Sequence, residues 1–552
     1  MSLQVISRAM VLGLTLALAA PSASAYTFVS QGTYQPIATT CSGTKSFFLT
    51  PSSSRTIGET LSYAKLTLKA CSVRIYLGSG TYSEDVGVGI DSELIGYGAA
   101  IINGQITNYG SNLTLRNLEL SNSAGAVLWS EHSNADNTLR NVVVSNAKNW
   151  AIYQQNGSLN ADGLQIERAR RVFDWMTNYR IYMARSSSSA VKHATASSVA
   201  QSANQAGIYL EDADFELQNV EISNMPQSAL MVRGVSQGDI SNLTVTQSGT
   251  ALTPSVFGGD NDYCGFWARE SCLWPSLSLG AVSFQSGASA VVNGLTVLGS
   301  SNVAVAVSGS GTFVRGNLWT VASNDGRGIA VGQAGNLVFG RSSLNGNRNT
   351  GLIVAGEGSH AELIYVDVVN TESNANGLGG RGIEVQRGAS LEVSQSRVLN
   401  NREFGLLVSD LDTAVALNES QVSGTRAAEC ATKSTLTCPG VGQGFGDGVV
   451  VLGGADLSLQ QFTITNNTRV GLYLYDTTES GLDDAPISII GAPTLEAQDG
   501  TITGNDYGIE FRRGNITPSS FSGAMVACYD NALTVDGCYS QIQVEVPSFE
   551  GL

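Results

Sequence analysis

A repeat of about 23 residues is the feature that most constrains the fold of this chain. Each copy has a turn that contains Asn, then Gly or Ala, then an apolar residue, a variable residue and a second apolar residue. Counted from Ala126, uninterrupted copies are separated by 22 to 25 residues. The Gly or Ala stands at Gly125, Ala151, Gly207, Ala229, Ala281, Ala304, Gly328, Gly351, Gly382, Gly405, Gly448, Gly471 and Gly508. The pattern predicts a short strand in every copy.

A second segment of alternating apolar and polar residues lies between these copies, for example at 113–120, 215–222, 290–297 and 457–464. Each unit therefore has two or three short strands. A leucine-rich repeat would show a fixed Leu and Asn consensus, and a propeller blade needs roughly 40 residues or more. The coil of a single-stranded parallel β-helix fits the repeat. About 14–16 coils stacked at the ~4.8 Å strand spacing would make a solenoid of roughly 70 Å.

The turn asparagines precede the Gly or Ala by three to five residues. They are Asn122, Asn146, Asn224, Asn324, Asn401 and Asn467. Asn tolerates left-handed backbone, and stacked amides can hydrogen-bond from one coil to the next. We therefore expect these residues to have a structural role in the turns.

The N-terminal region 56–104 resembles the first coils of secreted right-handed parallel β-helix proteins, the broad group that includes pectate lyases and pectin methylesterases. The matching features are a helical segment at Ile57–Ala64, a strand at Val73–Leu77, a turn at Gly78–Tyr82 and the later Ile95–Gly98. The resemblance implies an all-β, right-handed parallel β-helix with a short capping helix. It matches no specific enzyme family.

The first 25 residues are predicted to be a signal peptide, with Arg8, an apolar stretch and a small-x-small cleavage site at Ala23–Ala25. The protein is thus expected to be secreted, in the extracellular space, the periplasm or at the cell surface, with no membrane span after cleavage. The predicted divisions are 1–25 signal peptide, 26–104 cap and first coils, 105–511 β-helix and 512–552 C-terminal cap. Inserts are expected at about 253–275 and 425–447.

Eight cysteines fit an exported chain in an oxidising compartment. Their spacing favours four local disulfides: Cys41–Cys71, Cys264–Cys272, Cys430–Cys438 and Cys528–Cys538. A metal site would need tighter Cys pairs or nearby His. No cofactor is predicted; calcium stays open as an alternative, although no complete calcium motif occurs.

The formal net charge of −16 argues against sequence-independent nucleic-acid binding, which depends on basic surface. The site motifs of three enzyme groups with this fold, the polygalacturonases, the epimerases and the pectate lyases, are absent from this sequence. Whether the protein is an enzyme therefore stays undecided at this level.

One basic cluster lies at 167–185 in this acidic chain. Its candidate catalytic residues are Arg168, Arg171, Arg180 and Tyr182, and its candidate ligand-binding residues are Trp175 and Arg185. Arg binds carboxylates in a bidentate manner, so an acidic polysaccharide is the functional interpretation. In a lyase, an Arg or Tyr would abstract the proton alpha to a uronate carboxyl. The simpler alternative is a solvated loop whose aromatic residues pack on the coil.

The insert 253–275 is a second candidate ligand site, because long loops on a rigid scaffold often carry function. Its candidate residues are Asp260, Asp262, Trp267, Arg269, Glu270 and Trp274. The alternative is a disulfide-bonded loop that covers apolar surface. The insert 425–447 has Phe445 as its one aromatic residue and is interpreted as structural.

The variable residue of each apolar-x-apolar strand should point outward, and these residues form an unusually apolar column. The column is Leu128, Tyr153, Tyr209, Met231, Ser283, Ala306, Ala330, Ile353, Glu384, Leu407, Val450, Tyr473 and Glu510. Loops, a linear ligand such as a polysaccharide, or a second subunit could cover it.

The sequence leaves two hypotheses for the function of the protein. The first is a secreted β-helix protein that binds extracellular polysaccharide or a cell-surface protein in an adhesive or structural role. The alternative is a polysaccharide lyase or related carbohydrate-active enzyme acting on an acidic glycan. A trimeric phage-like spike is disfavoured by the signal sequence and the cysteines. The sequence does not give the oligomeric state.

Overall fold

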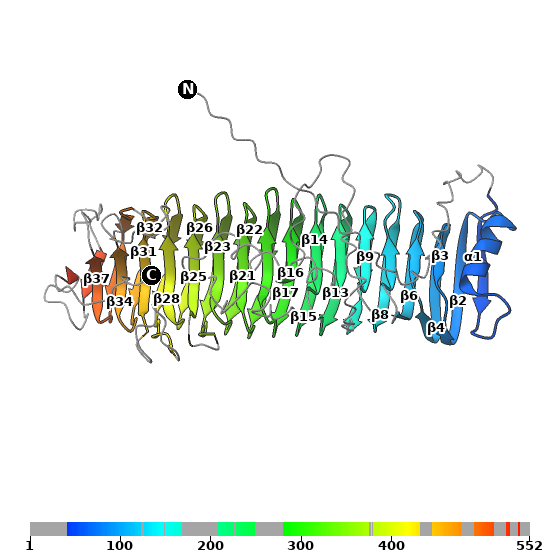
Figure 1. The fold of residues 1–552 in the computed structure, drawn as a ribbon, viewed down its shortest axis with the longest axis horizontal. Helices are drawn as coiled ribbons and strands as arrows, with labels where there is room; N and C mark the ends of the chain where they lie inside the picture. The colour runs from blue at the N-terminus through cyan, green and yellow to red at the C-terminus, as the bar shows by residue number, and fades with distance from the viewer. Residues whose placement is uncertain are drawn as a thin grey trace, which may run out of the picture.

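The computed structural model describes residues 41–122, 126–147, 150–167, 207–225, 228–248, 280–374, 377, 379–430, 444–475, 491–512, 526–529 and 539–540. In these residues, parallel strands form two sheets that run along a rod, with the helix α1 (Ile57–Leu66) at one end (Figure 1). Sheet A has 23 described strands and sheet B has 16. The parallel pairing between neighbouring coils confirms the predicted solenoid, and 16 strands agree with 14–16 coils.

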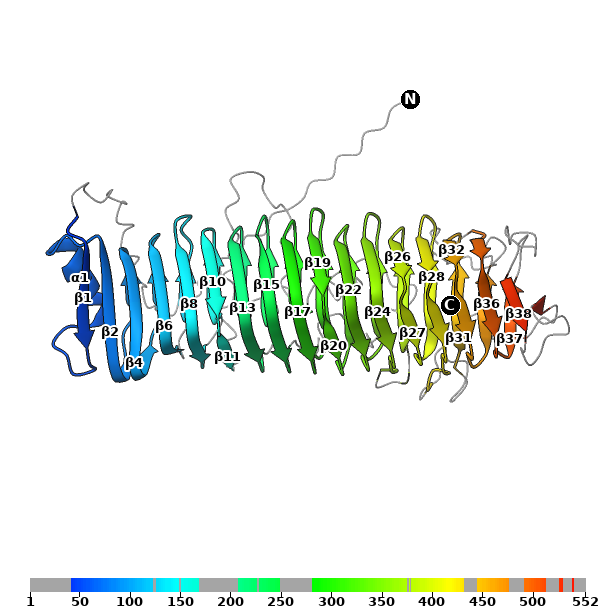
Figure 2. The same cartoon turned by 180° about the vertical axis from the view of Figure 1, so that it is seen from behind.

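Sheet A contributes one long strand or two shorter ones to each coil (Figure 2). Its strands are β1 (Thr44–Leu49), β2 (Ser72–Tyr82), β4 (Asp91–Asn103), β6 (Asn112–Ser121), β8 (Asp136–Ser145), β10 (Ser158–Asp162), β11 (Gln165–Glu167), β13 (Asp214–Ser223), β15 (Gln237–Thr246), β17 (Ser289–Leu298), β19 (Phe313–Asn317), β20 (Thr320–Ala322), β22 (Asn336–Asn345), β24 (His360–Val369), β26 (Ser390–Ser394), β27 (Arg397–Leu399), β29 (Ala414–Asn418), β30 (Gln421–Ser423), β32 (Asp456–Gln460), β33 (Thr463–Thr465), β35 (Thr494–Gln498), β36 (Gly500–Thr503) and β38 (Val526–Tyr529).

Sheet B contributes one short strand to each coil, the strand predicted after the Gly or Ala. Its strands are β3 (Val86–Val88), β5 (Ile106–Asn108), β7 (Leu128–Ser130), β9 (Ile152–Gln155), β12 (Ile208–Glu211), β14 (Leu230–Arg233), β16 (Gly280–Gln285), β18 (Val303–Ser308), β21 (Arg327–Gly332), β23 (Thr350–Ala355), β25 (Arg381–Gln386), β28 (Glu403–Ser409), β31 (Gly446–Leu452), β34 (Val470–Tyr475), β37 (Tyr507–Arg512) and β39 (Tyr539–Ser540).

One continuous apolar core fills the space between the two sheets. In sheet B, the residue before each outward position points into this core and pairs in register with its equivalent in the next coil. Ile152 pairs with Ile208, and Ile208 pairs with Leu230; all three are fully buried. The stacked aliphatic side chains remove their apolar area from water, which is the main contribution to the stability of the rod.

The predicted asparagines lie in the turn from sheet A to sheet B, where they occupy two adjacent positions. Asn146 and Asn224 occupy the first position, where they are exposed and left-handed with φ of 54° and 55°. Asn324, Asn401 and Asn467 occupy the next position, where they are buried. The amide of Asn324 donates to Oδ1 of Asn347 in the following coil at 2.7 Å. The ladder of amides thus occurs one residue after the left-handed turn residue.

The Gly or Ala position has a steric explanation in this stacking. A Cβ at Gly405 would lie 2.6 Å from the carbonyl oxygen of Gly448 in the next coil and 2.5 Å from Cγ1 of Val422. Backbone cannot move aside as a flexible side chain can, so only very small residues fit here.

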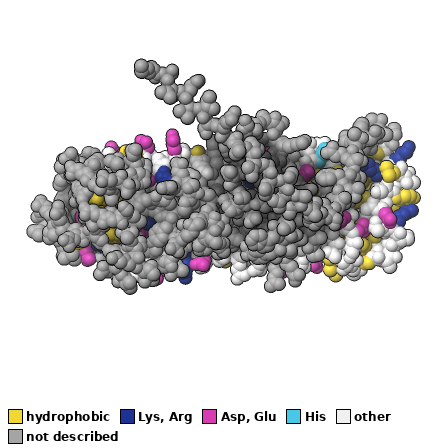
Figure 3. All heavy atoms as spheres, in the orientation of Figure 1, with side chains coloured by type: hydrophobic (Ala, Val, Ile, Leu, Met, Phe, Trp, Pro, Cys, Tyr) yellow, Lys and Arg dark blue, Asp and Glu magenta, His cyan; other side chains and the backbone are white. Residues whose placement is uncertain are grey.

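The helix α1 lies at the N-terminal end of the rod, where it was predicted. Thr56 and Glu59 form a capping box, and Ile57, Leu61 and Ala64 face the core. Figure 3 shows that hydrophobic, acidic and basic side chains are mixed on the surface at this end. The helix covers the apolar end of the solenoid, which would otherwise be exposed to water.

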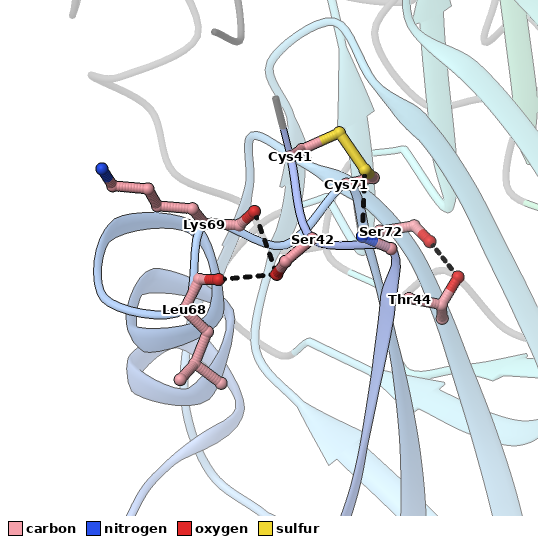
Figure 4. Close-up of a disulfide and its surroundings, with 8 residues drawn as sticks. Cys41, Ser42, Thr44, Leu68, Lys69, Cys71 and Ser72 are labelled. Carbon is pink, nitrogen blue, oxygen red and sulfur yellow. Dashed lines mark hydrogen bonds between the residues drawn. A yellow bond between two sulfur atoms is a disulfide. The ribbon is translucent and has the colours of Figure 1, made fainter. Parts of the chain in front are cut away.

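The Cys41–Cys71 disulfide joins the starts of β1 and β2 beside this helix (Figure 4). The Ser42 hydroxyl donates to the carbonyl of Leu68 at 2.8 Å. Cys430 is also disulfide-bonded. The predicted pairings Cys264–Cys272 and Cys528–Cys538, and Cys438, lie outside the residues whose side chains are described, as does the predicted signal peptide.

One local prediction is wrong. The segment Gly78–Tyr82 is not a turn but the second half of β2, which continues after a register shift between Gly78 and Gly80. The two glycines absorb this irregularity within the strand instead of ending it. In the part of the chain that the structure describes, no helix has the length and apolarity to cross a membrane.

Candidate functional site

The two candidate loop sites lie outside the described residues. This applies to Arg168, Arg171, Trp175, Arg180, Tyr182 and Arg185 of the first, and to Asp260, Asp262, Trp267, Arg269, Glu270 and Trp274 of the second. The outward column of sheet B is described, and the site is built from it.

The outward column is in register along sheet B, from Tyr153 through Tyr209 and Met231 to Ser283. Its apolar members pack in clusters separate from the main core, on the outer face of the sheet. The prediction that Leu128 belongs to the outward column is wrong, because Leu128 pairs with Ile152 and belongs to the main core. A shift of one residue moves a side chain to the opposite face, so the neighbouring Trp129 takes the outward place.

An aromatic cluster occupies this face on β7, β9 and β12. The rings of Trp129 and Tyr153 are stacked with centroids 4.1 Å apart, and those of Tyr153 and Tyr209 with centroids 5.1 Å apart and planes 3° apart. Trp150 packs against Tyr209 at 4.7 Å. Trp129 and Trp150 are partly exposed, whereas both tyrosines are buried. The rings of Trp129, Tyr153 and Tyr209 therefore form a stacked column, the Trp150 ring packs against it at an angle, and both indoles are partly exposed.

Polar groups adjoin the aromatic cluster. The Tyr209 hydroxyl donates to Oε2 of Glu211 at 3.0 Å, and Nη1 of Arg233 lies 3.5 Å from the same hydroxyl. Burial raises the pKa of Glu211 and of the Tyr209 hydroxyl above their ordinary values. A chain of tyrosine, carboxylate and guanidinium thus flanks the rings.

Small side chains follow along the column. Ser283, Ala306 and Ala330 are fully buried, and Ile353 lies next to them. The outer face consequently changes from bulky aromatic rings to a narrow stretch of small residues halfway along the rod.

An ionic cluster comes next, on β25 and β28. Nη1 of Arg381 is 2.9 Å from Oε1 of Glu384, and its Nε is 2.8 Å from Oε2 of Glu403. The Thr350 hydroxyl donates to Glu384 at 3.4 Å. Both carboxylates are buried, and the shared guanidinium offsets their charge.

A second guanidinium–carboxylate pair follows, between Asp447 of β31 and Arg469, the residue before β34. The Arg469 guanidinium binds the Asp447 carboxylate through Nε, at 2.7 Å, and through Nη2. It also lies 4.4 Å from the centre of the Phe445 ring. Since Asp447 is fully buried, this pair is part of the packed outer face and not a solvated surface ion pair.

Asp410 is a buried carboxyl in the turn after β28. Burial raises its pKa from the ordinary 3.8 to about 6, although the backbone N–H of Arg387 donates to Oδ2 at 3.0 Å and the Ser409 hydroxyl also lies nearby. The Glu384 carboxylate adds a smaller upward contribution. A carboxyl with such a pKa exchanges its proton near neutral pH.

A family model agrees with this fold over part of the chain. Residues 179–364 and 271–422 match the family model described as a right handed beta helix region. The chain folds as a right-handed parallel β-helix.

Solved structures similar to this β-helix have low sequence identity to it. Geobacillus virus E2 ORF18 is 10% identical with a TM-score of 0.27, and the chain spans about half of its length: 63% of this chain is covered and 49% of the viral one. The periplasmic alginate epimerase AlgG is 11% identical, with 88% and 83% covered and a TM-score of 0.32. A mannuronic acid specific polysaccharide family 6 lyase from human gut microbiota is 9% identical, with 87% and 90% covered and a TM-score of 0.29. A comparison with curated proteins finds no match.

Within the described coils of the β-helix, no group of three or more His, Cys, Asp or Glu is arranged to hold a metal ion. The described residues on the outer face of sheet B offer ring stacking, hydrogen bonding and charge. Sequence reasoning found the column, including Glu384, but not the ion pairs that Arg381 and Arg469 make on this face. The available signal was the Arg381-Gly-Ile-Glu384 sequence, in which charged residues replace apolar ones within the repeat.

Proposed function

We propose that this β-helix protein binds an extended polysaccharide outside the cell, along the outer face of sheet B, in an adhesive or structural role. The observation that carries the proposal is the aromatic cluster on this face, in which the indoles of Trp129 and Trp150 are partly exposed beside the buried rings of Tyr153 and Tyr209. An aromatic ring offers a flat apolar face on which the C–H face of a sugar can stack. The partly exposed indoles of Trp129 and Trp150 suit such contacts.

The direction of the column supports a linear ligand. The three rings come from β7, β9 and β12, which are neighbours along the rod, at ~4.8 Å per strand. A polymer lying parallel to the rod would contact the partly exposed indoles of Trp129 and Trp150, because Tyr153 and Tyr209 are buried. The Cys41–Cys71 disulfide supports a location outside the cytosol, because such bonds persist in oxidising compartments.

Binding of purified protein to a panel of neutral and acidic polysaccharides tests the proposal. We expect Trp129→Ala to weaken binding at least tenfold and Trp129→Phe to restore much of it, because Phe keeps a ring. Tyr365→Ala, which removes an exposed aromatic side chain on sheet A, is the matched control and should bind as wild type does. Equal affinities for Trp129→Ala and wild type, with equal melting temperatures, would contradict the proposal.

A second candidate function is catalysis on an acidic glycan by a lyase or related carbohydrate-active enzyme. Asp410, whose pKa is about 6, favours it, because an acid–base catalyst works best with a pKa near the operating pH. The test follows unsaturated-uronate absorbance and new reducing ends on the same polysaccharides. Turnover that is lost in Asp410→Asn would support catalysis, and the absence of turnover on every polymer that binds would exclude it.

A further inference from the structure

We infer that the outer face of sheet A binds a second copy of this chain, so that two rods lie side by side and run in opposite directions. The contact lies on the first half of the long strands in the middle of the rod, around β17, β19, β22, β24 and β26 (Figure 2). The inference goes beyond the proposed function and does not depend on it, because sheet B lies on the other side of the core.

Exposed apolar side chains gather on this face. Single apolar residues are ordinary on a protein surface, whereas a group of them on one face marks a contact. Val338 and Ile364 lie among them and are partly buried. The exposed members are Val291 of β17, Phe313 of β19, Leu318 directly after β19 and Tyr365 of β24, with exposed fractions of 40%, 39%, 57% and 52%.

Two of these residues have a backbone conformation that is unfavourable for them. One residue of left-handed φ lies between the two halves of each long strand, and in the six coils before Leu318 it is Asn or Gly. At Leu318 and Tyr365, φ is 58° and 57°. Residues other than Gly, Asn and Asp rarely adopt this conformation. The chain thus holds two apolar side chains in a strained conformation at the surface, where a second copy would remove them from water.

Four charged residues stand on the same face and form no ion pair within the described residues. Opposite charges in adjacent coils do pair elsewhere on sheet A, as Arg397 and Asp367 show. The four residues come from successive coils and are, in order along the rod, Arg315 of β19, Arg341 of β22, Glu362 of β24 and Glu392 of β26. Two basic residues are therefore followed by two acidic ones.

This order is unfavourable in a single chain. Glu362 and Glu392 stand directly opposite each other in the parallel pairing, and like charges in that arrangement are destabilising. Arg315 is separated from Glu362 by Val338 of the intervening strand and does not pair with it. A second rod that runs the other way brings its acidic half opposite the basic half of the first, and the reverse.

A twofold axis parallel to the strands, between β22 and β24, describes this dimer. Such an axis keeps the position along the strand and exchanges the coils on its two sides, so β19 faces β26 of the second copy. Arg315 then lies opposite Glu392 of the second copy, and this contact occurs twice. Ile364 lies opposite Gly340, which has no side chain and leaves room for it.

The face is large enough for a stable contact. Ten coils are arranged symmetrically about the axis, with the strands β13, β15, β17, β19, β22, β24, β26, β29, β32 and β35. They span about 48 Å along the rod, and a half-strand of five residues is about 17 Å long. The product is about 800 Å² per copy, which is the size of a standard specific interface.

Sedimentation equilibrium of the full chain tests the inference. We expect the wild type to dimerise at micromolar concentrations, and Arg315→Glu and Glu392→Arg each to weaken the dimer about tenfold or more, because each places like charges opposite each other. The double variant with both changes should dimerise as the wild type does. Arg140→Glu is the matched control, because Arg140 is an exposed arginine of sheet A that lies outside the ten coils.

The double variant gives the sharpest contradiction. A monomeric wild type, or a dimer with unchanged affinity in Arg315→Glu, would overturn the inference. Loss of the dimer in both single variants without recovery in the double variant would overturn the antiparallel arrangement. Polysaccharide affinity should equal that of the wild type in all these variants, since sheet B is not changed. The proposed function therefore fails or stands on Trp129→Ala alone, whatever the result of sedimentation.

Leu318→Asn provides a second readout. Asn tolerates a left-handed backbone better than Leu does, so this variant should melt no lower than the wild type in dilute solution. Its dimer should nevertheless be weaker, because the exposed apolar side chain is lost. A lower melting temperature with an unchanged dimer would show that Leu318 stabilises its own chain, which would overturn its place in the contact.

Discussion

The Arg381 guanidinium of one coil holds the Glu403 carboxylate of the next through two hydrogen bonds, from Nε at 2.8 Å and from Nη2 at 3.4 Å. Glu403 is fully buried, and the same guanidinium binds Glu384. Removing one partner of a buried ion pair leaves an uncompensated charge and typically costs about 3–5 kcal/mol. We therefore expect Arg381→Met to reduce the free energy of unfolding by about that amount, measured by denaturant titration.

The matched control for this change is Arg397→Met. Arg397 also makes two hydrogen bonds to a carboxylate, that of Asp367, but the pair lies at the surface. Exposed ion pairs contribute ~0–1 kcal/mol, so this variant should lose less than about 1 kcal/mol. Similar losses in the two variants would show that burial is not what makes the Arg381 pair important.

The buried carboxyl of Asp410 predicts a pH dependence of stability. Its pKa in the folded protein is about 6, above the ordinary 3.8, so between these values the folded state binds more protons than the unfolded state. Stability therefore falls as pH rises through this window. Asp410→Asn, whose Oδ1 can still accept from the Arg387 N–H, should be up to about 3 kcal/mol more stable than wild type at pH 7.

Below pH 4, Asp410→Asn and wild type should have equal stability, because the carboxyl is then neutral in both states. Thermal unfolding measured from pH 3.5 to 8 gives this difference directly. Exposed Asp239→Asn serves as the control and should show a constant, small difference. A difference for Asp410→Asn that does not change with pH would contradict the assignment.

A larger side chain at the glycine position near the start of a sheet B strand should destabilise the fold for steric reasons. In Gly405→Ala, the new Cβ would lie 2.6 Å from the Gly448 carbonyl oxygen, so the coil must shift. We expect a loss of about 1–3 kcal/mol, as for other overpacked sites. Gly89→Ala meets only the flexible end of Lys65 at 3.4 Å and should be tolerated. If Gly405→Ala and Gly89→Ala both have the melting temperature of the wild type, close contact between coils does not restrict the residue at position 405.

The buried amide ladder gives a further prediction. The Asn467 amide donates to Oδ1 of Asn505, and its own Oδ1 accepts from the Thr425 N–H at 3.0 Å. Asn467→Ala leaves buried backbone and side-chain groups without partners, so it should cost about 2–3 kcal/mol. Asn112→Ala removes an exposed amide that pairs with Asp91 and should cost less than about 1 kcal/mol, measured by chemical denaturation. Equal costs would argue against a stabilising role for the ladder.

Much of the fold could be predicted from the sequence because each coil repeats the same local chemistry. The Gly or Ala before each strand, the turn asparagines and the alternating apolar residues recur at fixed positions, and all have a local physical cause. The predictions failed where one residue changes the outcome. The segment around Leu128 is offset by one position, which places Trp129 and not Leu128 on the outer face.

The residues of the candidate site were harder to predict, because their roles depend on contacts between coils. Arg381 and Glu403 are 22 residues apart, and Arg426 binds Glu372 across 54 residues. Nothing in the local pattern distinguishes Arg381, which is paired, from Arg327, which has no ion pair within the described residues, since both stand directly before a Gly in the repeat. The difference arises only when the neighbouring coils bring, or fail to bring, a carboxylate within reach.

The sequence by itself determined that this chain winds into a parallel solenoid with a capped end, because a ~23-residue repeat of strand and turn can bury its apolar face only by stacking on its own copies. The tertiary structure decided which side chains share the outer face of sheet B: rings beside Arg233, small residues toward Arg327, and paired charges beyond. The physical reason is register. Parallel pairing aligns equivalent residues of successive coils at ~4.8 Å, and that alignment fixes which charged side chains lie close enough to neutralise one another.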